Sequence, residues 1–549
     1  MNQPNSVLSF LSRNKGYIIS VVITLILSYG FYASHYSIHI DQLMPEYYNG
    51  SILVGAGRWA TPLIHLLTNW MNFAPFWHTA LTAIILFCSS VAWSVLFSVV
   101  SADKIPQSAQ IAFGTVFVSY PVITAQLTYP VLNIVLAYVL VPVSLCQLYL
   151  GFADKKHLVK RLVISLLALI PAVDMYESFA SVYLVGFFAS LLLFFYYDNR
   201  TTAGIKDYLV LAAMAVGLLL AAVIADLIIS KLVNLVICGT TKFWYEPNTK
   251  IYWLSGAPIK NLVRFIVMMF TSFVIGSISL PFLLMFLVTV VIGTTGAVLL
   301  SVKKRSLFPA CIFIILCLSV VSLPLLIGRM VEFRQMQTLS VFVAFVIMLL
   351  FLYCRKNKKL HIVISCVLVV IVLNQTKDIN NYAVDNFERH TYEISLLQDI
   401  GKELLEYDTQ SKPVVFSAEN YQLPESLRHS RNEPNLIMTQ YRKYSALLFD
   451  NVLPKRFYDK VRGYGYVFRS SEELADQIAD SFTAYTSYIG WAYNDNYLRV
   501  MQRLGYSLQS CSAEQKAEAR KMVVANDPTC RFRIIENKDV ILVQIMTTP

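Results

Sequence analysis

The chain has 549 residues, of which 56% are hydrophobic and only 14% are charged. Its mean hydropathy of +0.55 excludes an ordinary soluble protein, and apolar runs of about 18 or more residues, long enough to cross a bilayer, recur along it. We interpret the formal net charge of +11 as a signal of membrane topology and lipid contact rather than of nucleic-acid binding.

The apolar runs predict about eleven transmembrane helices. They cover residues 17–34, 76–100, 108–123, 129–150, 160–173, 178–197, 208–236, 278–301, 307–328, 338–354 and 360–375. The segment KNLVRFIVMMFTSFVIG (260–276) is apolar too, but we expect a half-helix or an interfacial helix there. The N-terminus lacks a cleavage-site pattern, so the first run is expected to be a retained anchor.

Basic segments follow alternate predicted helices. Examples are DKKHLVKR (154–161), KKR (303–305) and RKNKK (355–359). All of them fall on one side of the membrane if 260–276 does not cross, and the positive-inside rule makes that side cytoplasmic. An odd number of spans then places residues 376–549 in the periplasm of a bacterium, and the expected location of the whole chain is the inner membrane.

The acidic residues predict a domain boundary near residue 376. Residues 1–375 contain 11 Asp and Glu against 24 Lys and Arg, whereas residues 376–549 contain 23 against 21. We therefore expect an all-α polytopic membrane domain (1–375) and a C-terminal α/β periplasmic domain (376–549). In the second domain the patterns predict a helix within 390–407, a strand at 412–418 and a hairpin that turns at Asn537 and Lys538.

Cysteines and acidic residues indicate where chemistry could occur. Cys511 and Cys530 are the only cysteines of the tail and could form a disulfide in an oxidising compartment. Seven acidic residues of the membrane half are expected near its periplasmic face or, for Asp226, inside a span: Asp41, Glu46, Asp174, Glu177, Asp226, Glu246 and Glu332. Acidic side chains at membrane depth are costly and usually functional, so this group predicts a site on that face.

Each of these acidic residues also has a structural interpretation. Asp41 and Glu46 could be solvated loop residues, Glu177 could cap the next helix, and Asp226 could pair inside the bundle without touching substrate. The same face is expected to carry Arg58, Arg329 and Arg334, whose planar guanidinium groups suit the oxygens of a donor phosphate. Snorkelling to the interface would explain Arg329 and Arg334 equally.

Sugar transfer from a lipid-linked phosphate would fit these residue types. One carboxylate would accept the proton of an acceptor hydroxyl, and the arginines would stabilise the leaving phosphate. Further candidate substrate contacts are Asp174, Tyr176, Glu177, Trp59 and Trp244, although an interfacial aromatic belt would account for most of the tryptophans. The chain contains no nucleotide fingerprint, P-loop, HExxH or GxSxG motif.

The order of three short motifs resembles a known family. The acidic segment HIDQLMPEYYNGSILVGAGRW (39–59) ends in GRW, the turn YES (176–178) follows later, and GRM (328–330) comes after a late span. In this order, over roughly residues 15–375, the chain resembles the Gtr-type glucosyltransferases that modify bacterial O-antigen and convert serotype. These are polyprenyl-phosphate-sugar-dependent enzymes of the GT-C architecture.

The resemblance implies a GT-C-like membrane domain and an inverting reaction on the periplasmic face. Glucose would pass from undecaprenyl-phosphate-glucose to the O-antigen of lipopolysaccharide, with a donor synthase and a flippase as functional partners and membrane lipids as surroundings. No cofactor is implied. The tail carries no motif of the family, and we expect it to take part in acceptor recognition.

The resemblance also implies that an acid of the first periplasmic loop is the general base, which corresponds to Asp41. Many GT-C enzymes have paired adjacent acids there, whereas Asp41 lies between Ile40 and Gln42 and has only Glu46 as a nearby second carboxylate. A metal-assisted mechanism is therefore not favoured, and no metal ligand is expected. A lipid or sugar transporter (a flippase), or an O-antigen polymerase or ligase that uses a pyrophosphate-linked donor, is the alternative function.

Overall fold

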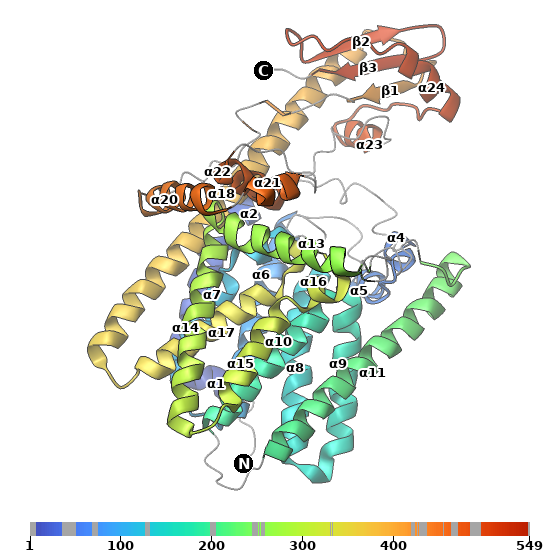
Figure 1. Cartoon of the computed structure of the whole chain (residues 1–549). Coiled ribbons are helices and arrows are strands. Elements are labelled where there is room, and N and C mark those ends of the chain that lie inside the picture. The colour runs from blue at the N-terminus through green and yellow to red at the C-terminus, as the bar shows by residue number, and fades with distance from the viewer. Residues whose placement is uncertain are drawn as a thin grey trace.

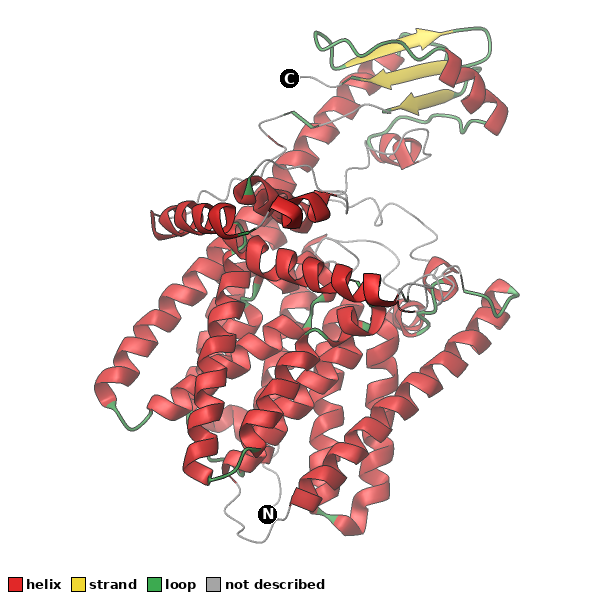
Figure 2. Ribbon diagram, viewed as in Figure 1, coloured by secondary structure: helices red, strands yellow, loops and turns green. Residues whose placement is uncertain are grey.

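The computed structural model shows a helical bundle with a smaller region of helices and strands beyond one end (Figure 1). It describes residues 7–35, 51–68, 75–126, 132–197, 205–243, 251, 253, 258–329, 331, 333–418, 423–424, 427, 436–453, 455–462, 470–483 and 496–546. Helices dominate both parts, and the strands lie together far from the bundle (Figure 2).

The first half of the bundle consists of helices joined by short connections. Its elements are α1 (Val7–Arg13), α2 (Lys15–Ser34), α4 (Ser51–Gly55), α5 (Ala60–Thr68), α6 (Pro75–Ser101), α7 (Gln107–Val118), η2 (Pro121–Gln126), α8 (Leu132–Ala153), η3 (Lys155–His157), α9 (Leu158–Met175), α10 (Ser178–Tyr197) and α11 (Ile205–Cys238). The second half contains α13 (Pro258–Phe270), η5 (Thr271–Ile275), η6 (Gly276–Ile278), α14 (Pro281–Lys304), α15 (Phe308–Val320), α16 (Ser322–Ile327), η7 (Phe333–Gln335), α17 (Thr338–Cys354) and α18 (Lys358–Leu404).

Eight of the described helical segments are long and apolar enough to cross a bilayer, fewer than the eleven spans expected from the sequence. Four of the expected spans correspond to helices that are not among these eight: α7, α9, α15 and α17. Three of these helices are shorter than 18 residues, and α9 carries Lys160, Arg161 and Asp174. The segment 307–328 also differs from its prediction, because it breaks at Val321 into α15 and α16.

Small residues let the helices of the bundle approach one another closely. A Cβ added to Gly186 of α10 would lie 2.4 Å from the buried ring of Trp93 on α6, and one added to Gly114 of α7 would lie 2.7 Å from Tyr17 of α2. Buried hydroxyl groups find partners between helices, as where Tyr29 donates to the carbonyl of Val118 at 2.7 Å. These contacts are the close packing typical of membrane helices.

The segment that we expected not to cross includes α13, which runs across the ends of the bundle helices rather than beside them (Figure 1). By length and composition alone, Ile259–Ile278 is among the eight candidate spans. Its 3-10 turn η6 packs against helices α20 (Leu436–Val452) and α22 (Ser471–Thr483) of the tail, and its π-helical turn η5 packs against α22. Tyr441 hydrogen-bonds to Ser277 at 3.0 Å, and the rings of Phe270 and Phe449 lie 6.3 Å apart.

Helix α18 leads from the bundle into the tail without a break at residue 376. Its first part follows α2, where Thr376 and Ser28 hydrogen-bond at 3.2 Å and Asn380 donates to the carbonyl of Leu27 at 2.8 Å. No proline or glycine interrupts the sequence between its start and Gly401, so nothing local ends the helix at the membrane. The proposed boundary therefore lies within a continuous helix.

The tail contains a three-stranded sheet and several short helices. Strand β3 (Ile541–Ile545) lies between β1 (Val414–Ser417), to which it is parallel, and β2 (Phe532–Glu536), to which it is antiparallel. The expected hairpin and the expected strand at 412–418 are thus confirmed. The helices are α20, α21 (Lys455–Arg462), α22 (Ser471–Thr483), α23 (Asn496–Arg503) and α24 (Ala513–Lys521).

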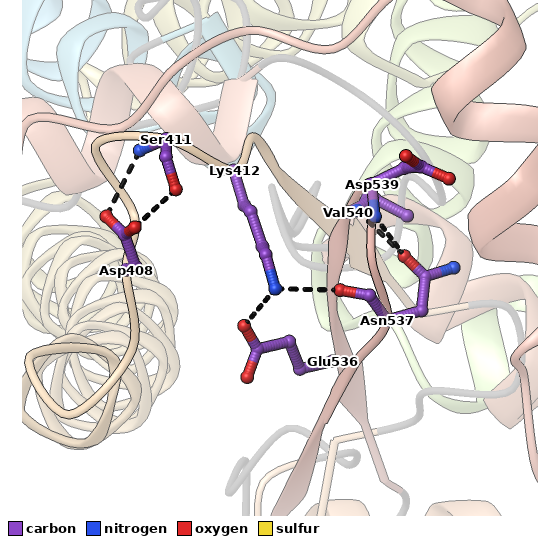
Figure 3. Close-up of polar contacts among 7 residues, drawn as sticks. All are labelled: Asp408, Ser411, Lys412, Glu536, Asn537, Asp539 and Val540. Carbon is purple, nitrogen blue, oxygen red and sulfur yellow. Dashed lines mark hydrogen bonds and ion pairs between the residues drawn. The ribbon is translucent and has the colours of Figure 1, made fainter.

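Polar contacts fix the ends of the strands (Figure 3). The ammonium group of Lys412 donates to Glu536 at 2.6 Å and to the carbonyl of Asn537 at 2.9 Å, which joins the start of β1 to the hairpin. The preceding turn is held by Asp408, which accepts hydrogen bonds from the hydroxyl and the amide of Ser411. These hydrogen bonds hold the pKa of Asp408 below its ordinary value.

Cys511 and Cys530 are free thiols in the structure. Cys511 donates to the carbonyl of Val414 at 3.3 Å, whereas Cys530 donates to that of Asp527 at 3.7 Å. Each sulfur thus contacts the backbone of a different segment, and the two cysteines are not joined in this structure.

Candidate active site

The GRW segment lies in the turn between α4 and α5. Gly57 has φ +84, a left-handed conformation that glycine adopts without strain, and its carbonyl accepts a hydrogen bond from Ser230 of α11 at 3.1 Å. The amide of Arg58 donates back to Leu53 of α4 at 2.9 Å. The turn therefore presents Arg58 and Trp59 from a fixed backbone.

Asp174, which belongs to α9, caps the start of α5. Its two carboxylate oxygens accept hydrogen bonds from the backbone amides of Trp59, at 2.9 Å, and Ala60, at 2.6 Å. The first amides of a helix have no partner within it, and a negative charge there is favourable. Asp174 is only 2% exposed and occupies the last turn of α9, where its charge opposes the dipole of its own helix. The two hydrogen bonds from the start of α5 compensate for this unfavourable interaction with the dipole of α9.

Trp59 connects Asp174 to a second carboxyl group. Its indole N–H donates to Asp226 of α11 at 3.0 Å, while its backbone amide donates to Asp174. The carboxyl groups of Asp174 and Asp226 are also close enough to interact with one another. One residue of the GRW segment thus holds two acidic side chains from separate helices at one place.

Arg58 lies beside the turn that joins α9 to α10. Its guanidinium group is 3.4 Å from the carboxylate of Glu177 and 4.8 Å from the centre of the Tyr176 ring. The side chains of Arg58 and Glu177 are 25% and 54% exposed, whereas Tyr176 is buried. The cation is therefore held over an aromatic face, and its carboxylate partner remains open to solvent.

Arg329 lies at the end of α16, at the same end of the bundle. Ser322 at the start of α16 donates to Ser181 in the first turn of α10 at 2.7 Å, close in sequence to Glu177. Gly328, with φ +80, ends the helix, and the side chain of Arg329 is exposed. The carbonyl of Leu325 accepts a 2.7 Å hydrogen bond from the indole of Trp253, which supports this short helix.

Several predicted site residues cannot be placed. Asp41, Glu46 and Trp244 lie outside the described residues, and so does the side chain of Arg334, which belongs to η7. Within the described ranges, no group of three or more His, Cys, Asp or Glu is arranged to hold a metal ion. Of the predicted residues that are described, Arg58, Trp59, Asp174, Tyr176 and Glu177 form one cluster.

Helix α11 contributes two further residues to the cluster: Asp226, one of the seven acidic residues that the sequence indicated, and Ser230, which the sequence did not indicate. Asp226 and Ser230 of α11 bind Trp59 and Gly57 respectively, and the buried Asn234 one turn further on donates to the carbonyl of Lys242 at 2.9 Å. The three are spaced by four residues, so they share one face of the helix. This polar stripe inside an apolar span is a signal that sequence alone could have shown.

The long apolar helices and the polar cluster at one end of the bundle define the class of the molecule, a polytopic membrane protein. A family model described as Glucosyl transferase GtrII matches residues 30–351. This is more than half of the chain, so the chain belongs to the GtrII glucosyltransferase family and is a membrane glycosyltransferase. The matched region contains the whole cluster and ends before α18 and the tail. Comparison with curated proteins and with solved structures gives no match.

Proposed function

We propose that this glycosyltransferase transfers glucose from undecaprenyl-phosphate-glucose to the O-antigen of lipopolysaccharide, with inversion, on the periplasmic face of the bacterial inner membrane. The observation that carries the proposal is the cluster around the GRW segment within the family region. It places Arg58 at a half-open position beside Glu177, next to two acidic side chains held by Trp59.

Arg58 has the surroundings expected of a phosphate ligand. Its partner Glu177 lies at the long distance of 3.4 Å and is mostly exposed, so a donor phosphate could replace it at little cost. Arginine binds phosphate oxygens with two parallel N–H donors. Together with Arg329 and Arg334 it would stabilise the negative charge that develops on the leaving undecaprenyl phosphate.

Asp41 would be the general base of the reaction. It precedes the GRW segment by 16 to 18 residues, so the same periplasmic segment would supply both the base and the first phosphate ligand. The carboxylate would accept the proton of the acceptor hydroxyl as that oxygen attacks the sugar C1. The C1–oxygen bond to the lipid phosphate would break on the opposite side, which gives inversion. Glu46 would be the second carboxylate of this region.

Transfer by the purified full chain tests the proposal. The wild type is expected to move labelled glucose from undecaprenyl-phosphate-glucose to O-antigen and to leave a pyrophosphate-linked donor unused. Asp41→Asn should abolish transfer at normal abundance in the membrane. The matched control is Asp207→Asn in the first turn of α11, at the opposite end of the bundle, which should keep wild-type activity.

Three results would contradict the proposal. Full transfer by Asp41→Asn would show that Asp41 is not the general base. Use of the pyrophosphate-linked donor would indicate a polymerase or ligase. Lipid movement across reconstituted vesicles without sugar transfer would indicate a flippase. Mass spectrometry of lipopolysaccharide from cells with and without the protein would identify the acceptor sugar.

A further inference from the structure

A groove of about 430 Å³ opens between α10, α14 and α17, away from the candidate active site. Helix α10 starts directly after Glu177 and reaches the groove only at Leu192 and Tyr196. Tyr196 is 19 residues beyond Glu177, which is about 28 Å along a helix. The groove therefore lies in the half of the bundle where α10 and α14 end.

The groove is hollow because α14 has small residues along one side of it. A Cβ added to Gly296 would meet no heavy atom within 4 Å, whereas one added to Gly293 would lie 2.2 Å from the ring of Phe313. Gly293 thus packs against α15, and Gly296 faces open space. The opposite wall is apolar and includes Leu192 and Val346.

The length of the groove matches one leaflet of a bilayer. Helix α14 lines it from Val291 to Lys303, which is about 18 Å at 1.5 Å per residue. The hydrocarbon core of a bilayer is about 30 Å thick, so the groove extends from near its middle to one surface. The exposed side chains of Val291 and Leu299 leave it open to the lipid on one side.

The end of the groove at the membrane surface is basic. Lys303 lines it, Lys304 extends over the ring of Phe195 at 6.0 Å, and Arg305 and Arg355 follow the ends of α14 and α17. No acidic side chain forms an ion pair with Lys303 in the part of the chain that the structure describes. A cation at this depth matches the phosphate of a lipid whose chain enters the groove.

We propose that this groove binds an anionic phospholipid from the leaflet on the basic side of the bundle. One acyl chain lies along α14 beside Gly296, and the phosphate contacts Lys303. The lipid is a structural or regulatory ligand, and the proposal does not depend on the identity of the sugar donor, because the site is about one membrane thickness from Arg58.

Native mass spectrometry of the purified full chain with dioleoyl phosphatidylglycerol tests this proposal. The wild type should retain phosphatidylglycerol in preference to phosphatidylcholine. Gly296→Leu places an apolar side chain in the groove, at a position where an added Cβ meets no heavy atom within 4 Å, and should abolish the preference. Lys303→Gln should reduce retention about five-fold, because one basic residue near the membrane surface contributes about 1 kcal/mol.

Matched controls distinguish lipid binding in the groove from non-specific lipid binding elsewhere on the bundle. Gly217→Leu changes a glycine of α11 that also has open space around it, and Lys206→Gln removes a base from the start of the same helix. Both should retain phosphatidylglycerol as the wild type does. Wild-type retention by Gly296→Leu or by Lys303→Gln would overturn the proposal. So would displacement of phosphatidylglycerol by an equimolar amount of undecaprenyl phosphate, since the groove would then be a polyprenyl site.

Discussion

Asp174 accepts a 2.6 Å hydrogen bond from the backbone amide of Ala60, so a carboxylate at the end of α9 caps the start of α5. The two residues are 114 positions apart in the sequence. The cap determines where the GRW segment lies relative to the α9–α10 turn, and with it the distance between Arg58 and Glu177. The geometry of the candidate active site therefore depends on a buried side chain that need not touch substrate.

We expect Asp174→Asn to destabilise this region and to reduce transfer. An asparagine can accept from one of the two amides but presents N–H groups to the other, and an unsatisfied buried donor costs about 1–3 kcal/mol. The thermal midpoint of the purified protein and the transfer rate should both fall. Asp207→Asn is the control, and an unchanged midpoint in Asp174→Asn would show that the cap has no energetic importance.

The bond between Trp59 and Asp226 can be measured by a double-mutant cycle. Trp59→Phe removes the indole donor, and Asp226→Leu removes the acceptor of this partly buried donor. If the 3.0 Å hydrogen bond is energetically significant, the combined loss of stability should be smaller than the sum of the single losses by about 0.5–3 kcal/mol. Asp226→Asn keeps an acceptor oxygen and should cost less than Asp226→Leu. Additive losses would mean that the contact contributes nothing.

Arg58 and Glu177 should have opposite kinetic effects. Arg58→Gln should raise the KM for the lipid donor, because the proposed phosphate ligand is lost. Glu177→Gln should leave protein abundance unchanged, because an exposed ion pair contributes about 0–1 kcal/mol, and it should lower the donor KM by freeing the guanidinium group. Steady-state kinetics with varied donor distinguish the two. Equal effects of both variants would instead assign the pair a structural role.

The predicted helices agree with the structure where an apolar run is bounded by polar residues. The runs 178–197 and 338–354 coincide with α10 and α17. One disagreement falls at a proline: 108–123 divides before Pro121 into α7 and η2, because a proline lacks the amide that the helix ladder requires. Pro142 and Pro171, by contrast, lie inside the continuous helices α8 and α9. Helix α18 is also longer than the apolar run 360–375 that predicted it. It continues beyond the run because its later residues pack into the core of the tail.

The candidate site could be predicted only in part. The sequence indicated that Arg58, Asp174 and Glu177 share one end of the bundle, because each comes at the same end of a predicted span. It could not indicate which acidic side chain accepts a hydrogen bond from which backbone amide, since that depends on how α5, α9 and α11 pack. Trp59 was a candidate substrate contact, and its hydrogen bonds to two acidic residues depend on the packing of α9 and α11, which the sequence does not show.

Gly328→Ala should destabilise the protein more than Gly239→Ala. Both glycines have positive φ, +80 and +69, so alanine brings a backbone strain of about 1 kcal/mol at each. Only at Gly328 would the new Cβ also meet a neighbour, the indole of Trp253 at 2.8 Å. The thermal midpoints of the two variants should therefore differ, and the donor KM should rise only in Gly328→Ala, which displaces Arg329. Equal midpoints would mean that Trp253 can move at no cost.

Gly401→Ala tests whether the tail takes part in acceptor recognition. A Cβ at this position of α18 would lie 2.3 Å from the ring of Tyr506, in the core that α18 forms with the strands. Such overpacking costs about 1–3 kcal/mol and should move the tail relative to α18.

We expect the KM for the O-antigen acceptor to rise in Gly401→Ala while the KM for the lipid donor stays constant, because the proposed donor ligands Arg58, Arg329 and Arg334 lie within residues 30–351, outside the tail. Tyr506→Leu combined with Gly401→Ala removes the clash and should restore acceptor use, which separates repositioning from unfolding. Limited proteolysis would report the altered packing independently. A protease-sensitive tail with an unchanged acceptor KM would show that the tail serves another purpose.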